Sequence, residues 1–122
     1  MSGILKLAEA LPHSQLTSLS LDDNQLTGPP YSPDMSGILK LAEALPHSQL
    51  TSLSLCRCEL DPKCGAAIAE GLKGNSTLCS LNLNENCIGV GGDVSSILKL
   101  AEALSHSQLT SLSLANNQIC GM

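Results

Sequence analysis

Two patterns of hydrophobic and polar residues alternate along the chain, and the first has the period of a helix. Within residues 38–45, aliphatic side chains recur at positions i, i+3, i+4 and i+7, whereas Lys40 and Glu43 fall on the opposite side. This spacing predicts an amphipathic helix with one buried face. Pro46 follows the pattern and is expected to end the helix, because proline cannot continue helical hydrogen bonding.

The second pattern has the period of a strand. Within residues 50–55, Leu53 and Leu55 share one side. Ser52 and Ser54 share the other side, which predicts a short strand with one buried face. A polar turn follows, and an aliphatic residue then returns to the core. The pattern recurs along the chain, and the expected strands are 16–21, 50–55, 78–83 and 109–114.

Both patterns belong to a repeat. Residues 1–21 and 35–55 are identical, and residues 96–114 differ from the matching part of the second copy at only two positions. A more diverged copy occupies residues 65–83. A unit of this size cannot bury its apolar face alone, so we expect the units to stack into a solenoid.

The strand-and-turn segments resemble the leucine-rich repeat pattern. They read LTSLSLDDNQL, LTSLSLCRCEL, LCSLNLNENCI and LTSLSLANNQI, which match L-x-x-L-x-L-x-x-N/C-x-L/I. With its helical segment GAAIAEGL, the 28-residue unit is similar to the ribonuclease-inhibitor subtype. That subtype also forms the repeat regions of NOD-like receptors and of Ran GTPase-activating protein. The resemblance implies an α/β solenoid, a horseshoe segment with parallel strands on the concave side and helices on the convex side.

We therefore expect residues 1–122 to form a single leucine-rich repeat domain of about four repeats that is a fragment of a longer array. The asparagine of each turn is expected to satisfy backbone groups of neighbouring turns. Cys58 takes this position in the second unit, and its weaker donor predicts a slightly looser turn. The outer units each lack a neighbour, so we expect self-association through uncapped ends, with the strand edge at 109–114 most exposed.

Composition and charge narrow the class of partner. Lys and Arg together number 6 and Asp and Glu together number 11, which gives a net charge of −5. This balance excludes a basic footprint for nucleic acid and a polybasic membrane patch. Tyr31 is the single aromatic residue, so a base-stacking platform is also excluded. We expect a protein partner, with no nucleic acid and no membrane.

No segment near the N-terminus has the pattern of a signal peptide. No apolar run approaches the ~18 residues that a membrane span needs. A cytoplasmic location is therefore predicted. Because the cytoplasm is reducing, we expect the 6 cysteines to be free thiols and not disulfides.

The concave face is expected to bear the residues between and just after the strand leucines. They are Ser18, Ser20, Asp22, Asp23, Ser52, Ser54, Cys56, Arg57, Ser80, Asn82, Asn84, Glu85, Ser111, Ser113, Ala115 and Asn116. All of them except Asp23 and Ala115 are candidate partner-binding residues, because the resemblance implies protein binding on this surface. The alternative is a plain solvated surface, since small serines offer little area and aromatic anchors are missing.

No arrangement of residues predicts catalysis, a cofactor or a metal site. Cys56 and Cys58 form a C-x-C pair, but strand alternation directs them apart, and no second pair completes a tetrahedral zinc site. The glycine-rich segment 89–92 lacks the Gly-Lys-Ser/Thr ending of a phosphate loop and is interpreted as a turn. The spacing of Pro30 and Pro33 is interpreted as a loop rather than a docking motif. The recurrent loop histidines, which lack catalytic partners, are His13, His47 and His106.

The leading hypothesis is a non-enzymatic protein–protein interaction module that binds through its concave face, as part of a NOD-like-receptor type sensor or regulator. One alternative is a GTPase-activating regulator similar to Ran GTPase-activating protein, for which Arg57 is the only arginine in the chain. The other alternative is a structural repeat fragment without separate activity.

Overall fold

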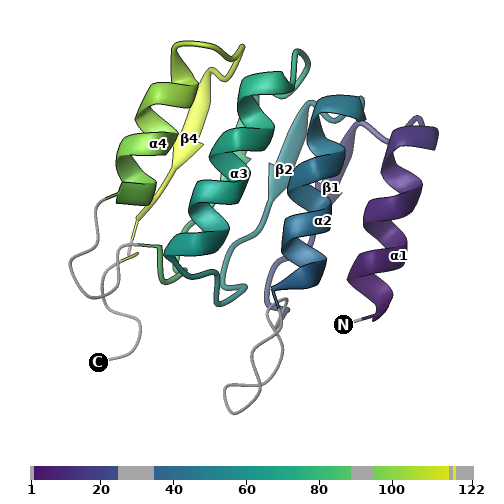
Figure 1. Ribbon diagram of the computed structural model, residues 1–122, viewed down its shortest axis with the longest axis horizontal. Coiled ribbons are helices and arrows are strands. Elements are labelled where there is room, and N and C mark those ends of the chain that lie inside the picture. The colour runs from purple at the N-terminus through teal and green to yellow at the C-terminus, as the bar shows by residue number, and fades with distance from the viewer. Residues whose placement is uncertain (1, 25–34, 89–94, 116, 118–122) are drawn as a thin grey trace.

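Helices and strands alternate along the chain and form two layers (Figure 1). The computed structural model describes residues 2–24, 35–88, 95–115 and 117. The elements are α1 (Ser2–Ala10), η1 (Leu11–His13), β1 (Ser18–Ser20), α2 (Ser36–Ala44), η2 (Leu45–His47), β2 (Ser52–Ser54), α3 (Pro62–Gly74), β3 (Ser80–Asn82), α4 (Ser95–Leu104) and β4 (Ser111–Ser113). The α-helices stand side by side and cover one face of the sheet. Within the described ranges, no helix is long and apolar enough to span a bilayer.

The strands form one parallel sheet in the order β1-β2-β3-β4. The register places Leu53 of β2 between Leu19 of β1 and Leu81 of β3. This confirms the predicted α/β solenoid, although each strand has 3 residues and is shorter than its predicted range. The ladder of backbone hydrogen bonds continues past the strands, as where the N–H of Leu21 donates to the carbonyl of Ser54 (2.9 Å).

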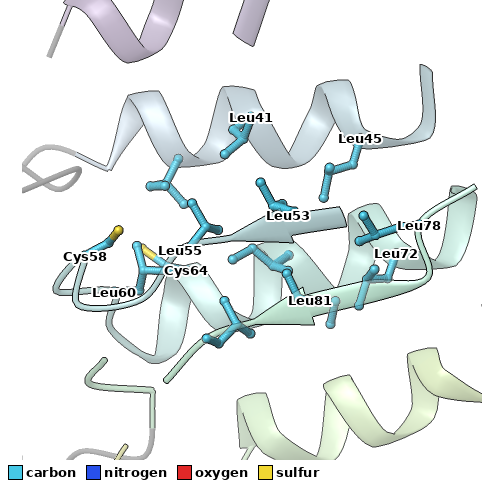
Figure 2. Packing of buried hydrophobic residues seen from close by; sticks show 14 of the residues in the cluster. Leu41, Leu45, Leu53, Leu55, Cys58, Leu60, Cys64, Leu72, Leu78 and Leu81 are labelled. Atoms are coloured by element: carbon cyan, nitrogen blue, oxygen red, sulfur yellow. The ribbon is translucent and has the colours of Figure 1, made fainter. Parts of the chain in front are cut away.

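The core lies between the two layers and consists mainly of aliphatic side chains (Figure 2). Leu41 and Leu45 descend from the helical layer, and Leu53 and Leu55 rise from the sheet; none is more than 1% exposed. The apolar side of the helix predicted for residues 38–45 is therefore buried, as expected. Burial of each leucine contributes about 1.5–3 kcal/mol, so this aliphatic layer is what holds the helices on the sheet.

α3 sits one residue out of phase with α2 relative to the strands. The buried Ile68 and Leu72 follow Leu41 and Leu45 by 27 residues, whereas β3 follows β2 by 28. The last turn of α3 takes the place of η2, and the extra residue lies in the loop that begins at Asn75. The Asn75 side chain donates to the carbonyl of Leu45 (2.6 Å) and accepts from two backbone N–H groups of this loop. A buried amide thus compensates for the shift.

Asparagine side chains join the turns of neighbouring units, as the sequence predicted. The Oδ1 atom of Asn86 accepts hydrogen bonds from the backbone N–H groups of Cys58 (2.9 Å) and Leu60 (3.1 Å). Asn117 repeats this arrangement one unit later. Cys58 occupies the same place in the second unit, where its thiol donates to the carbonyl of Leu21 (3.0 Å). The donor role is kept there by sulfur, and the looser turn stays a prediction.

The state of the cysteines differs in part from the expectation. Cys56, Cys58, Cys64 and Cys79 are free thiols. Cys87 is disulfide-bonded, so the expectation of free thiols at all cysteines is wrong for this residue. The expectation rested on the cellular compartment alone. A disulfide also depends on two Cα atoms lying roughly 4–7 Å apart, and the spacing of cysteines along the chain does not reveal that distance.

The last unit is less well covered than the inner ones. Leu45 and Leu50 of the second unit are fully buried, whereas the equivalent Leu104 is 39% exposed and Leu109 is half-buried. In the first unit Leu16 is also exposed, at 41%. These aliphatic flanks have the character that the sequence predicted, and self-association through them stays a prediction.

Candidate binding site on the concave face

The serines predicted for the concave face lie on the side of the sheet away from the helices. In β2, Ser52 and Ser54 are half-buried and alternate with the buried Leu53, so their hydroxyls face away from the core. The parallel register arranges the candidate residues in two rows across the sheet. The first row is Ser18, Ser52, Ser80 and Ser111, and the second is Ser20, Ser54, Asn82 and Ser113. The structure therefore brings these candidates together on one surface.

A third row lies just after the strands, and hydrogen bonds connect its members across units. The row consists of Asp22, Cys56, Asn84 and Ala115. The Oδ1 atom of Asp22 accepts from the hydroxyl of Ser54 (2.6 Å) and from the backbone N–H of Cys56 (2.8 Å). Between the third and fourth units, Oδ1 of Asn84 accepts from the backbone N–H of Ala115 (2.8 Å). The hydrogen bond from Ser54 is the main cause that lowers the pKa of Asp22. Asp22 therefore stays ionised to a lower pH than an ordinary aspartate.

The outermost row of the face is charged and consists of Asp23, Arg57 and Glu85. All three have left-handed backbone conformations, with φ of 64°, 55° and 59°, which places them at equivalent points of successive turns. Arg57 donates through Nε and Nη2 to the two carboxylate oxygens of Asp23, the latter at 3.1 Å. Its Nη1 donates to Oε2 of Glu85 (2.9 Å). One guanidinium is thus shared between carboxylates of the preceding and the following unit.

This charged row shows what the sequence reasoning missed. Asp23 is expected on the concave face but is not among the candidate partner-binding residues, although its carboxylate accepts two hydrogen bonds from Arg57. The guanidinium, which donates to it in a bidentate manner, lowers the pKa of the Asp23 carboxyl. A signal was present in the sequence, because Asp23, Arg57 and Glu85 occupy the same position of successive repeats with alternating charge.

Both thiols of the C-x-C pair are buried, with Cys56 at 7% and Cys58 at 0% exposed, and their predicted divergence stays a prediction. Cys56 lies in the third row, bonded through its backbone to Asp22, whereas Cys58 is fully buried beneath the turn. Burial raises the pKa of the Cys58 thiol to about 11 and also raises that of Cys56. In the described ranges no three side chains of His, Cys, Asp or Glu are grouped so that they could hold a metal ion. Independence from metal stays a prediction.

Of the remaining candidates, the structure describes only the loop histidines. His13 and His47 are exposed at the ends of the short helical turns η1 and η2. His106 is exposed just after α4. Asn116, the segment 30–33 with Tyr31, and the glycine-rich segment 89–92 lie outside the described residues.

Comparison with known proteins agrees with this architecture. The sequence profile of the leucine-rich repeat matches residues 15–34, which include β1 and the turn after it. No curated protein matches the sequence of the chain. The match therefore identifies one leucine-rich repeat within the chain.

Two similar solved structures extend the comparison to nearly the whole chain. Actin-binding site 2 of leiomodin-1 matches with a TM-score of 0.74 and 25% sequence identity over 98% of this chain and 65% of that chain. The C-terminal domain of a tropomodulin from Caenorhabditis elegans matches with a TM-score of 0.73 and 15% identity over 98% of this chain and 67% of that chain. The chain thus spans about two thirds of each structure. Together with the parallel sheet and its covering helices, these matches show that it folds as a segment of an α/β leucine-rich-repeat solenoid.

Proposed function

We propose that the chain is a non-enzymatic module that binds another protein through its concave face. The observation that carries this proposal is the ordered polar layer on that face. Hydroxyl and amide side chains stand in register across the sheet, and the charged row borders them. Because the aliphatic core fixes the strands, the face is organised before a partner arrives, which lowers the entropic cost of binding.

The charges of the face favour a partner surface that carries basic and hydrogen-bond-donating groups. Asp22, Asp23 and Glu85 supply carboxylates, and Arg57 supplies the only guanidinium, already shared between two of them. Exposed charges of this kind contribute little affinity, but they guide association and fix the orientation of the partner. The serines are small and let a partner approach closely, so the large anchoring side chains must come from the partner.

Actin is the partner that we propose to test first. The support is the similarity to actin-binding site 2 of leiomodin-1, which extends over 98% of this chain. A role in a NOD-like-receptor type sensor, and membership of the ribonuclease-inhibitor subtype, have their support in the sequence pattern of the 28-residue unit. Both remain part of the proposal, behind actin binding.

Co-sedimentation with filamentous actin tests the proposal. Ser80 lies in the central part of the concave face, between its partners in β2 and β4. Ser80→Arg places a bulky cation against a basic partner surface and is expected to weaken binding about tenfold. Ala101→Arg makes the same charge change at an exposed position of α4 and should leave binding unchanged. Absence of wild-type co-sedimentation, or equal binding by both variants, would contradict the proposal.

A GTPase-activating role is the alternative that the sequence raised. It would require Arg57 to reach a bound nucleotide, because it is the only arginine in the chain. In the structure the Arg57 guanidinium is engaged by Asp23 and Glu85, and both contacts would have to break. Stimulation of a GTPase that Arg57→Ala abolishes would favour this alternative over the binding module.

A further inference from the structure

Figure 1 shows α2 and α3 side by side on the helical face, on the opposite side of the sheet from the concave face. A groove lies between these two helices. Its volume is about 360 Å³. Leu39 and Ala42 line it from α2, and Ala67 and Gly71 line it from α3. Leu39 is 42% exposed, although it belongs to a helix whose other aliphatic side chains are mostly buried. This α2–α3 groove is therefore an apolar depression that is open to solvent.

Each of the two neighbouring seams between helices has a lysine that the α2–α3 groove lacks. The smaller groove between α1 and α2, of about 310 Å³, is lined by Lys40. Ala67 follows Lys40 by 27 residues, the same offset that relates the buried residues of α2 and α3. At the seam between α3 and α4, Lys73 reaches across to Glu102 (2.8 Å). The residues that line the α2–α3 groove include no lysine.

The α2–α3 groove is preformed, because the two helices already touch at its floor. A Cβ atom built on Gly71 would lie only 2.6 Å from the carbonyl oxygen of Ala42, so the backbones are in contact there. The helices cannot move closer together and close the groove. A ligand that enters it would therefore meet an existing surface and would not have to separate the helices.

The rim of the groove is acidic. Glu43 from α2 and Glu70 from α3 line it, and their side chains are 72% and 61% exposed. Each has a lysine of its own helix at long distance, Lys40 at 3.9 Å and Lys73 at 3.8 Å. Because Lys73 lies closer to a carboxylate of α4, at 2.8 Å, it compensates the charge of Glu70 only weakly.

We propose that the α2–α3 groove binds a peptide segment of a protein partner in which one large apolar side chain is flanked by Lys or Arg on both sides. The apolar floor removes the central side chain from water, and Glu43 and Glu70 pair with the flanking cations. A volume of about 360 Å³ is near the lower end of the roughly 300–1,000 Å³ range of ligand pockets, so it suits a few side chains. The net charge of −5 assists the approach of such a segment.

Fluorescence polarisation with three short labelled peptides tests the chemistry of this site. The first peptide has a central Phe between two pairs of Arg, the second has Glu in place of every Arg, and the third has Ser in place of Phe. The first is expected to bind, and its affinity should fall as salt is added. The other two should bind at least about tenfold more weakly. Equal binding of all three, or no binding of the first at about 1 mM protein, would overturn the proposal.

Variants of the chain test its location. Ala67→Lys places a lysine where the α1–α2 seam has one and is expected to weaken binding of the first peptide about tenfold. The double change Glu43→Gln with Glu70→Gln should also weaken binding and flatten its salt dependence. Ala101→Lys makes the same change at an exposed position of α4, outside the groove lining. It is the matched control and should bind like the wild type. The circular dichroism of each variant should be unchanged. Wild-type affinity in both groove variants would overturn the assignment.

Discussion

Arg57 reaches back across one repeat and binds both carboxylate oxygens of Asp23, which stands 34 residues earlier at the same point of its own turn. The contact exists only because the parallel register stacks the turns directly on one another. It links the charged row of the concave face to the stacking of the units.

The first prediction concerns the titration of Asp23. Arg57→Ala should return the pKa of the Asp23 carboxyl to its usual value of 3.8, because the bidentate guanidinium is the main cause that lowers it. Arg57→Lys keeps the charge but not the two-point contact, and should return the pKa only in part. NMR titration of the carboxyl signal measures both, and an unchanged pKa in Arg57→Ala would contradict the contact.

The same contact has a consequence for stability against pH. A carboxyl group whose pKa is lower in the folded than in the unfolded chain stabilises the fold. This contribution is complete at pH values above the unfolded-state pKa and is lost as the pH falls through the folded-state pKa. For Asp23 the loss lies below about pH 3.8. As the pH falls through this range, the free energy of unfolding of Arg57→Ala should therefore decrease less than that of the wild type. Identical acid-unfolding curves would contradict it.

The second prediction uses the left-handed backbone at Glu85, where φ is 59°. Glu85→Gly and Glu85→Ala both remove the ion pair with Arg57, so the difference between them isolates the backbone. Glycine adopts this conformation without steric cost, whereas alanine pays roughly 1 kcal/mol. Glu85→Gly should therefore be more stable than Glu85→Ala by about 1 kcal/mol in urea unfolding. Equal stability of the two variants would show that the turn relaxes.

The third prediction concerns the asparagines that join the turns. Asn86→Ala leaves two buried backbone N–H groups, those of Cys58 and Leu60, without their acceptor. The cost should be at least about 2 kcal/mol of unfolding free energy, because each buried unsatisfied donor is expensive. Asn24→Ala is the matched control, since Asn24 is exposed and its side-chain amide donates to the carbonyls of Leu21 and Asp22 within its own turn. Similar losses for both variants would contradict the role assigned to Asn86.

The fourth prediction concerns thiol reactivity. Among the free thiols of the described residues, Cys79 is the most accessible, whereas Cys58 and Cys64 are fully buried. Burial raises the pKa of Cys58 to about 11 and that of Cys64 to about 12, so little reactive thiolate forms at either near pH 8. A thiol reagent should label Cys79 before Cys58 and Cys64, and Cys79→Ser should remove that early labelling. Labelling of the buried pair first would contradict the packing.

Much of the fold could be predicted from the sequence because the repeats impose it. The alternation of Leu53 with its neighbouring serines fixes which side of β2 is buried, and near-identical copies must then stack in register. The role of Asn86 also followed from its position, since a turn at that place leaves backbone groups that need an amide.

The parts that could not be predicted depend on contacts between units. The shift of α3 arises from how Ile68 and Leu72 pack against the core, and no local pattern shows that the loop beginning at Asn75 takes up the extra residue. The bidentate ion pair between Arg57 and Asp23 depends on left-handed turns, which bring together two side chains that are distant in the sequence. The α2–α3 groove lacks a lysine because Ala67 stands where Lys40 stands one unit earlier, and this difference matters only once the helices lie side by side.

The central claim is that the concave face binds a protein, with actin as the first candidate, and an NMR footprint tests it most directly. Isotope-labelled chain is mixed with actin, and the loss of amide signal intensity is mapped residue by residue. The account predicts that the losses concentrate at Ser52, Ser80 and Arg57. The signals of Leu39 and Ala67 on the helical face should lose no more intensity than the uniform broadening that a larger complex causes. Losses confined to the helical face, or no change at all on adding actin, would contradict it.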